Sequence, residues 1–277
     1  MFSRRQFLAA AGAGALGARP MGLRIGVMDG VLRQSGKPAA VALAKSFGFK
    51  GLQVTIGRPA AGSGRLPLED PELQAAYLAE ARKHGVALDA TYLDILHVNC
   101  LKNDALARQW VLRGIGITRA LQARILMTVF FGQCALASRA ETGYAADVFR
   151  ELAPEAARAG VIIGFENLLS AEENARVLDR VGSPAFQIYY DVGNSTNMGG
   201  FDAPQEIRFL GRERICQFHF KDKGYLGEGK VDFAAVLKAV GDIGFQGYAN
   251  LETSAPSGNM EADLRRNAGY LRALMRS

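Results

Sequence analysis

Short apolar runs alternate along the chain with longer segments in which apolar residues recur every three or four positions. The first pattern is typical of buried strands and the second of amphipathic helices. The pattern predicts strands at residues 23–28, 51–56, 86–91, 124–131, 161–165, 186–190, 215–220 and 247–251. It predicts helices at residues 38–47, 70–84, 104–120, 140–159, 172–181, 204–210, 232–243 and 260–275.

Polar residues, proline and glycine between these segments support the predicted helix ends. Asp70 and Pro71 form an N-cap followed by a proline at the first helical position, where its missing N–H costs nothing. The same helix is expected to end at Lys83-His84-Gly85, where two cationic side chains precede a glycine cap.

Eight strand–helix units in succession favour a parallel sheet with its helices outside. We therefore predict an α/β fold, a single eight-stranded parallel (β/α)8 TIM barrel over residues 22–277. An open, doubly wound sheet is the alternative. It would normally carry a glycine-rich phosphate-binding turn after the first strand, and Gly26-Val27-Met28-Asp29-Gly30 is not one.

The first 18 residues have a different character from the barrel. Ser3-Arg4-Arg5-Gln6-Phe7-Leu8 precedes a run of Ala, Gly and Leu that extends to Ala18. This arrangement resembles a twin-arginine export signal and predicts an exported, periplasmic or extracytoplasmic protein. A frayed tail on a cytoplasmic protein is the other interpretation. The apolar run is too short and too rich in Gly and Ala for a stable membrane span.

Composition narrows the class of function. Apolar residues make up 49% of the chain and charged residues 22%, which is ordinary for a globular enzyme. The net charge of +6 comes from scattered basic residues, without the basic and aromatic face of a nucleic-acid-binding protein. Cys100, Cys134 and Cys216 are odd in number and fit no C-x-x-C spacing, so neither a disulfide framework nor a zinc knuckle is expected.

Four predicted strands in the C-terminal half end on residues that can bind a metal ion. These residues are Glu166, Asp191, His219 and Glu252, and the spacings between them are 25, 28 and 33 residues, about one strand–helix unit each. In a closed parallel barrel the strand ends meet at one mouth, where barrel active sites lie. Three carboxylates and an imidazole suit one divalent metal ion: Mn, Mg, Co or Zn.

The same region resembles the xylose-isomerase-like barrels, also called the sugar phosphate isomerase/epimerase family. The resemblance depends on Phe165-Glu166-Asn167, Tyr190-Asp191-Val192-Gly193-Asn194, His219-Phe220-Lys221-Asp222, Gly227-Glu228-Gly229 and Leu251-Glu252-Thr253. It implies that Glu166, Asp191, His219 and Glu252 hold one divalent cation that binds a hydroxy-carbonyl sugar. It also implies that Glu166 and Glu252 are the catalytic acid/base pair, moving a proton through an enediolate.

Two positions depart from the ketose epimerases of this family. Many of them carry a histidine three residues after the aspartate ligand, where this chain has Asn194, and an arginine where it has Tyr225. Asparagine can hydrogen-bond a substrate oxygen but cannot deliver a proton. The Lys221-Asp222 pair resembles the branch that contains inosose dehydratases, and Lys221 is a candidate substrate-binding residue.

Two further positions are candidates for substrate contact. Glu172 lies where some epimerases place a substrate-binding glutamate, although an exposed position in the first helical turn is the competing interpretation. His97 is predicted in the loop after the third strand, where it could contact substrate, although the pattern favours a plain loop histidine.

Several functions stay open at this point. The leading hypothesis is a sugar or cyclitol isomerase/epimerase, with a dehydratase/lyase on a keto-sugar or inosose as its alternative. An endonuclease-type barrel would need a histidine-rich zinc cluster, and this chain has three histidines in all. A non-catalytic sugar-binding barrel is the third possibility. The expected partner is a small carbohydrate rather than a nucleic acid, and family members often form homo-oligomers.

Overall fold

The predicted barrel is confirmed in a computed structural model, which describes residues 22–276. Eight parallel strands follow one another in chain order around a closed barrel. They are β1 (Gly22–Met28), β2 (Gly51–Thr55), β3 (Ala87–Tyr92), β4 (Ile125–Val129), β5 (Ile162–Glu166), β6 (Phe186–Asp191), β7 (Ile215–Phe220) and β8 (Gln246–Leu251). The ring closes where β1 pairs with β8, from Gly22 opposite Gln246 to Val27 opposite Leu251.

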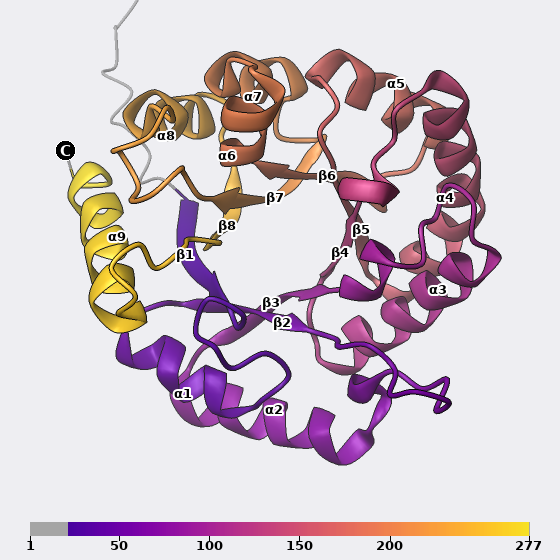
Figure 1. Ribbon diagram of the computed structural model, residues 1–277, viewed down its shortest axis with the longest axis horizontal. Coiled ribbons are helices and arrows are strands. Elements are labelled where there is room, and N and C mark those ends of the chain that lie inside the picture. The colour runs from indigo at the N-terminus through magenta and orange to yellow at the C-terminus, as the bar shows by residue number, and fades with distance from the viewer. Residues whose placement is uncertain (1–21, 277) are drawn as a thin grey trace, which may run out of the picture.

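Helices surround the strands on every side (Figure 1). They are α1 (Ala39–Ser46), α2 (Pro71–His84), α3 (Ala105–Ala120), α4 (Arg139–Ala159), α5 (Ala171–Val181), α6 (Val192–Asn194), α7 (Ala203–Leu210), α8 (Phe233–Asp242) and α9 (Met260–Leu274). Short helical turns in the loops escaped the sequence pattern: η1 (Pro67–Glu69), η2 (Asp94–His97), η3 (Gly132–Cys134) and η4 (Ser195–Gly199).

The helix ends follow the expected capping chemistry. The Asp70 side chain accepts from the Glu72 backbone N–H at 3.0 Å, and Gly85 ends α2 with a left-handed φ of 62°. Within residues 22–276, no helix has the length and apolar content needed to cross a bilayer. The proposed leader, residues 1–18, lies outside the described residues, so the export signal stays a prediction.

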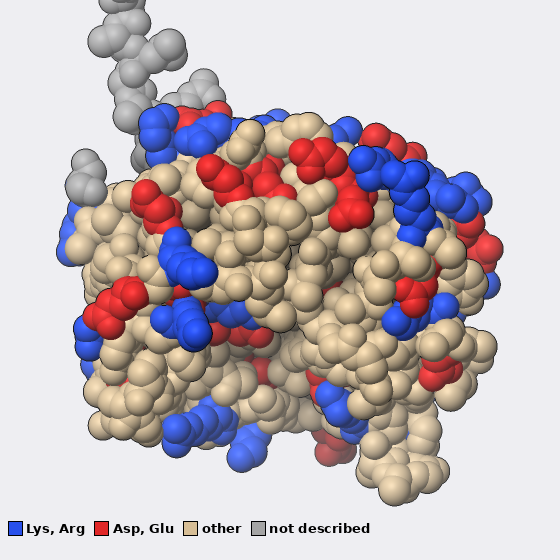
Figure 2. Space-filling view, turned by 45° about the horizontal axis from the view of Figure 1, so that its top comes forward, with Lys and Arg blue, Asp and Glu red and all other residues tan. Residues whose placement is uncertain are grey.

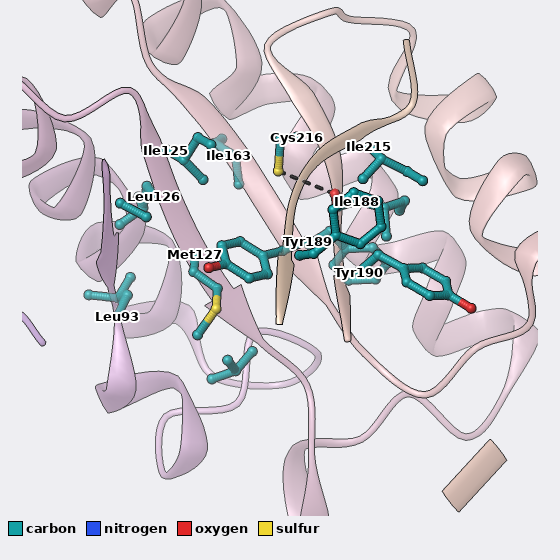
Figure 3. Close-up of a cluster of buried hydrophobic side chains, with 14 of the residues drawn as sticks. Leu93, Ile125, Leu126, Met127, Ile163, Ile188, Tyr189, Tyr190, Ile215 and Cys216 are labelled. Atoms are coloured by element: carbon teal, nitrogen blue, oxygen red, sulfur yellow. Dashed lines mark hydrogen bonds between the residues drawn. The ribbon is translucent and has the colours of Figure 1, made fainter. Parts of the chain in front are cut away.

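Alternate residues of each strand point into the barrel or outward against the helices. Tyr189 and Tyr190 lie next to each other on β6, and Figure 3 shows their side chains pointing to opposite sides of the strand, with Tyr189 directed towards Met127. This alternation follows from the period of two in a β-strand. It gives the barrel two apolar zones, one inside the ring and one under the helices.

Aromatic side chains form much of the outer zone beside β4, β5 and β6. The Phe165 ring centroid lies 4.8 Å from that of Phe130, 5.9 Å from that of Phe149 and 5.4 Å from that of Phe186. All four side chains are buried. Because Phe165 immediately precedes Glu166, this cluster also fixes the end of β5 that carries a candidate ligand.

One expectation from the cysteine pattern is wrong. Cys100 and Cys134 form a disulfide with a Cα–Cα distance of 4.8 Å, while Cys216 is free and buried. The two cysteines are 34 residues apart, so no short spacing marks them. They meet because β3 and β4 are neighbours in the barrel, and the loops that follow these strands lie side by side at its mouth.

Truncating Phe165 should therefore destabilise the barrel strongly. We expect Phe165→Ala to lower the free energy of unfolding by about 3–5 kcal/mol, because it opens a cavity inside an aromatic cluster. The matched control is Phe209→Ala in α7, where the ring is 52% exposed and the expected change is within about 0.5 kcal/mol. Urea unfolding monitored by circular dichroism measures both, and equal losses would contradict the assignment of this core.

Candidate metal centre

The barrel brings Glu166, Asp191, His219 and Glu252 together at its mouth. Glu166 and Asp191 are the last residues of β5 and β6, His219 is the penultimate residue of β7, and Glu252 directly follows β8. Asp191 is registered opposite His219 across the β6–β7 pair. One ligand atom from each of the four residues lies within 4.8 Å of the others, a spacing that allows a single metal ion to touch all four.

His219 is the centre of this cluster. Its Nδ1 lies 2.8 Å from Glu166 Oε1, 3.3 Å from Glu252 Oε2 and 3.9 Å from Asp191 Oδ2. The other ring nitrogen, Nε2, lies 2.7 Å from Gln53 Oε1. An amide oxygen only accepts, so Nε2 donates to it. In the neutral ring Nδ1 then carries the lone pair that a metal needs.

Lys221 contributes the positive charge that balances the carboxylates. Its Nζ donates to Glu252 Oε2 at 2.6 Å and lies 2.8 Å from Asp191 Oδ2. Asp191 Oδ2 is buried and has no partner in hydrogen-bonding geometry among the described residues. Three carboxylates this close together, with the Lys221 ammonium beside two of them, fit a further cation, and the three-carboxylate, one-imidazole donor set fits a divalent one.

Burial and mutual charge shift the proton affinities of the cluster. Burial raises the pKa of Asp191 to about 8, against the opposing effect of Lys221. Burial would lower the pKa of His219, but the charges of Glu166 and Glu252 outweigh it and raise that pKa to about 10. The metal-free cluster therefore holds protons near neutral pH, and a metal ion must displace them.

The two remaining shifted groups are both ionised. Burial opposes the negative charge of Glu252, yet His219 and Lys221 hold its pKa well below the usual range. Burial likewise opposes the ammonium of Lys221, but Asp191 and Glu252 raise its pKa above the ordinary lysine value. The Glu252 side chain is 31% exposed, whereas Glu166 is 3% exposed, so a molecule that enters the mouth reaches Glu252 first.

A layer of buried polar side chains lies beneath the cluster, and sequence reasoning missed it. Gln217 Nε2 and Asn250 Nδ2 both donate to Asp89 Oδ1 at 2.8 Å. Both also donate to the Tyr189 hydroxyl, at 3.1 and 3.3 Å, and the Tyr189 ring lies 4.6 Å from the His219 ring. The sequence signal that could have revealed this layer is a polar residue, such as Gln217 or Asn250, inside an otherwise apolar strand.

The loop after β7 is organised around Asp222. Its carboxylate accepts from the backbone N–H of Lys223 at 2.8 Å and from those of Lys230 and Val231 at 3.2 Å each. A side chain at Gly229 would place its Cβ 2.1 Å from Asp222 Oδ1, so only glycine fits. The Lys-Asp and Gly-Glu-Gly segments thus close one loop, which begins at Lys221 in the site.

The other candidate residues lie at different distances from the cluster. Asn194 is buried, and its backbone N–H donates to Asp191 Oδ1 at 2.8 Å. His97 ends η2 in the β3–α3 loop, with Nε2 2.6 Å from the Tyr92 hydroxyl and its ring stacked on Phe131. Glu172 is exposed in the first turn of α5 and makes none of the contacts that join the cluster.

The mouth of the barrel is open to solvent. Figure 2 shows a hollow on this side of the molecule, with acidic and basic side chains around it. The four candidate ligands come from the last strands of the barrel, β5 to β8, and the β3 and β4 loops lie across from them (Figure 1).

A family model described as xylose isomerase-like TIM barrel matches residues 41–274. The chain belongs to this family. The match includes all four candidate metal ligands, so the resemblance read from the strand ends is confirmed at the level of the family.

A curated relative is the 2-epi-5-epi-valiolone 7-phosphate 2-epimerase of Actinoplanes sp. (strain ATCC 31044 / CBS 674.73 / SE50/110). It is 29% identical over 181 residues, which span 65% of this chain and 65% of the relative. Solved structures show the same fold. An L-ribulose 3-epimerase, 19% identical, superposes with a TM-score of 0.74 over 92% of this chain and 95% of its own.

A D-psicose 3-epimerase from Clostridium cellulolyticum H10, solved with D-tagatose, has a TM-score of 0.75. It is 16% identical over 91% of this chain and 98% of its own. A 3-keto-D-glucoside 4-epimerase from E. coli has a TM-score of 0.70 at 16% identity, over 91% and 99% of the two chains. At these identities the structures establish the barrel and its topology for this chain.

Metal binding should release protons. At pH 7 Asp191, with its pKa near 8, and His219, with its pKa near 10, both carry protons that Mg²⁺ displaces. Between pH 7 and pH 9 Asp191 ionises, so the number of protons released should fall by about one and the affinity should rise. Titration calorimetry in buffers of different ionisation enthalpy measures the release. A count that does not change with pH would contradict it.

Lys221 should compete with the metal for its carboxylates. We expect Lys221→Met to raise the affinity for Mg²⁺ about tenfold, because the ion no longer displaces or faces an ammonium group. The measurement is best made at alkaline pH, where protons compete least. Lys223→Met, at the exposed neighbour, is the matched control and should leave the affinity unchanged. Weaker binding in Lys221→Met would instead mean that Lys221 positions Asp191 and Glu252 for the ion.

Proposed function

We propose that this protein is a metal-dependent epimerase or isomerase of a sugar or cyclitol. The observation that carries the proposal is the convergence of Glu166, Asp191, His219 and Glu252, with one ligand atom each within 4.8 Å, at the mouth of a closed barrel. The names of the curated relative and of several solved neighbours add support, since each is an epimerase of a carbohydrate or cyclitol.

The reaction needs a proton removed next to a carbonyl and returned to the same or the neighbouring carbon. A divalent cation held by Glu166, Asp191, His219 and Glu252 would polarise that carbonyl and stabilise negative charge on its oxygen. Glu166 ends β5 and Glu252 follows β8, and their carboxylates lie 2.8 and 3.3 Å from the same nitrogen, His219 Nδ1. Two carboxylates at two positions can exchange protons with two faces of one planar enediolate.

The two glutamates differ in exposure, and this difference suggests which of them accepts the substrate proton. Glu252 is ionised and partly exposed, so it is ready to accept a proton from an incoming substrate. Glu166 is buried at the end of β5, where its carbonyl accepts from the Phe130 N–H at 3.0 Å, so the backbone that carries it is fixed. Around them, Lys221, Asn194 and His97 can bind hydroxyl or carbonyl oxygens of the substrate.

A dehydratase or lyase acting on a keto-sugar or inosose is the second candidate. It would begin with the same proton abstraction and then expel a β-hydroxyl group. Lys221 supports this possibility, because its Nζ lies between Asp191 and Glu252, where an ammonium can bind or protonate a departing oxygen.

We also propose that the mature protein works outside the cytoplasm. The twin-arginine pattern at residues 3–8 supports this location. The Cys100–Cys134 disulfide supports it independently, since such bonds persist in oxidising compartments. A carbohydrate available outside the cytoplasm would then be the substrate.

Proton exchange in deuterated water tests the proposed chemistry. Protein loaded with Mn, Mg, Co or Zn is mixed with ketoses, keto-sugars and inososes, and deuterium beside the carbonyl is followed by NMR. We expect exchange, and Glu252→Gln should slow it about 10²- to 10⁴-fold through loss of the proton acceptor. The structure of the product separates epimerisation from dehydration.

Glu213→Gln is the matched control for this experiment. Glu213 is 82% exposed and precedes β7 at the opposite end of the barrel. The Glu213→Gln variant should therefore catalyse proton exchange at the wild-type rate. Stoichiometric bound metal without exchange on any compound would favour a non-catalytic sugar-binding barrel. Absence of metal binding would overturn the site itself.

A further inference from the structure

We propose that the Cys100–Cys134 disulfide is a positioning cross-link, which holds His97 and Phe131 as one wall of the substrate site. Phe131 and the disulfide then help to set substrate affinity, while the metal centre on the opposite strands is independent of them. The inference rests on the proposed function in so far as it names a substrate, but the geometry of the wall can be tested without one.

The disulfide lies beside the two rings that form the wall. β3 and β4 are paired, with Tyr92 opposite Met127, and each strand runs into a loop at the mouth. Cys100 follows His97 by three residues, and Cys134 follows Phe131 by three residues. The covalent bond therefore joins the two loops at equal sequence separations from the stacked pair, whose ring centroids are 6.2 Å apart.

The other links between these loops are few and partly exposed. Gln133 Nε2 donates to the His97 carbonyl at 3.3 Å, and Lys102 Nζ donates to the Ala135 carbonyl at 2.8 Å. Lys102 also forms an ion pair with Glu141 at 3.0 Å. Long hydrogen bonds and solvent-accessible ion pairs stabilise a loop weakly. The disulfide is buried, so it is the stronger constraint on the separation of the loops.

His97 is half-buried and has one ring nitrogen without a partner in the described residues. Its Nε2 lies 2.6 Å from the Tyr92 hydroxyl, and the hydroxyl donates to Nε2 in the tautomer that carries the ring proton on Nδ1. Burial and the nearby Arg58 lower the pKa of His97 and keep the ring neutral. Nδ1 has no hydrogen-bond partner within residues 22–276, so it can donate to a substrate oxygen in one tautomer of the neutral ring or accept from a substrate hydroxyl in the other.

The wall also faces the proposed catalytic groups. The Phe130 N–H donates to the Glu166 carbonyl at 3.0 Å, so Phe131 begins its loop beside the end of β5 that carries one member of the acid/base pair. The electrostatic effect of Glu166 and Glu252 on the pKa values of His97 and Tyr92 agrees with this placement. A ring that binds a hydroxyl group beside that pair fixes which carbon of the substrate faces Glu252. Small displacements of such a group weaken productive binding severely.

The first test uses NMR of the three histidine rings, assigned with His97→Gln and His84→Gln. Dithiothreitol gives two electrons and two protons to the disulfide, yielding two thiols, and itself becomes a cyclic disulfide. We expect the His97 resonances to shift or broaden on reduction, while those of His84, on α2, stay unchanged. Mass spectrometry after alkylation counts the thiols released.

The second test uses the substrate identified by proton exchange. Reduction, or the Cys100→Ser/Cys134→Ser variant, should raise KM about tenfold and leave kcat within about twofold, because the wall and not the acid/base pair is displaced. The affinity for Mg²⁺ should not change. The double variant should no longer respond to reductant, and Cys216→Ala should respond like the wild type.

These outcomes separate a positioning role from a stabilising one. If the thiols are released and the protein melts at a lower temperature, but the His97 resonances and KM stay unchanged, the disulfide only stabilises the fold and the inference is wrong. If no compound exchanges protons, the resonances still decide the geometry of the wall. If the double variant does not fold, reduction of the folded wild type serves in its place.

Discussion

Three carboxylates around one buried imidazole are the arrangement on which the rest of the mouth depends. Glu166, Asp191 and Glu252 all lie within 3.9 Å of His219 Nδ1, and like charges at such distances repel strongly where water is scarce. In the absence of a metal ion the repulsion is relieved by Lys221 and by bound protons, as the raised pKa values of Asp191 and His219 show. A divalent cation offers the same relief without protons.

The topology of the barrel brings these four residues together although they are far apart in the sequence. Consecutive strands are parallel, so residues that end β5, β6, β7 and β8 reach the same end of the molecule whatever lies between them. Beneath them, Gln53 on β2 holds the far nitrogen of His219, and the ring of Tyr189 lies against its side. The imidazole is therefore fixed by strands on both sides of the barrel, which leaves its free nitrogen directed at the carboxylates.

The features that could be predicted from the sequence are those that depend on residues close together along the chain. Strand and helix periods gave the eight units, and apolar runs ending on Glu166, Asp191, His219 and Glu252 gave the cluster, because a parallel barrel turns strand ends into neighbours. The helix caps at Asp70 and Gly85 were likewise local.

Contacts between distant segments could not be read in the same way. Gln53 and His219 are separated by 166 residues, and nothing near either residue marks the other as its partner. Cys100 and Cys134 are hidden for a similar reason: only the pairing of β3 with β4 brings their loops together. Glu172 shows that nearness in sequence to a site residue does not guarantee a place in the site. It follows Glu166 by only six residues, yet it lies on the exposed face of α5.

The site therefore has two halves with different requirements. The metal half is made by strand ends, and its geometry is as rigid as the barrel, since each ligand is at or beside a hydrogen-bonded strand residue. The opposite half is made by the loops after β3 and β4, which have no ladder to hold them and use a covalent bond instead. In the proposed reaction the rigid cluster would fix where a proton can move, and the wall of His97 and Phe131 would fix which carbon is presented to it.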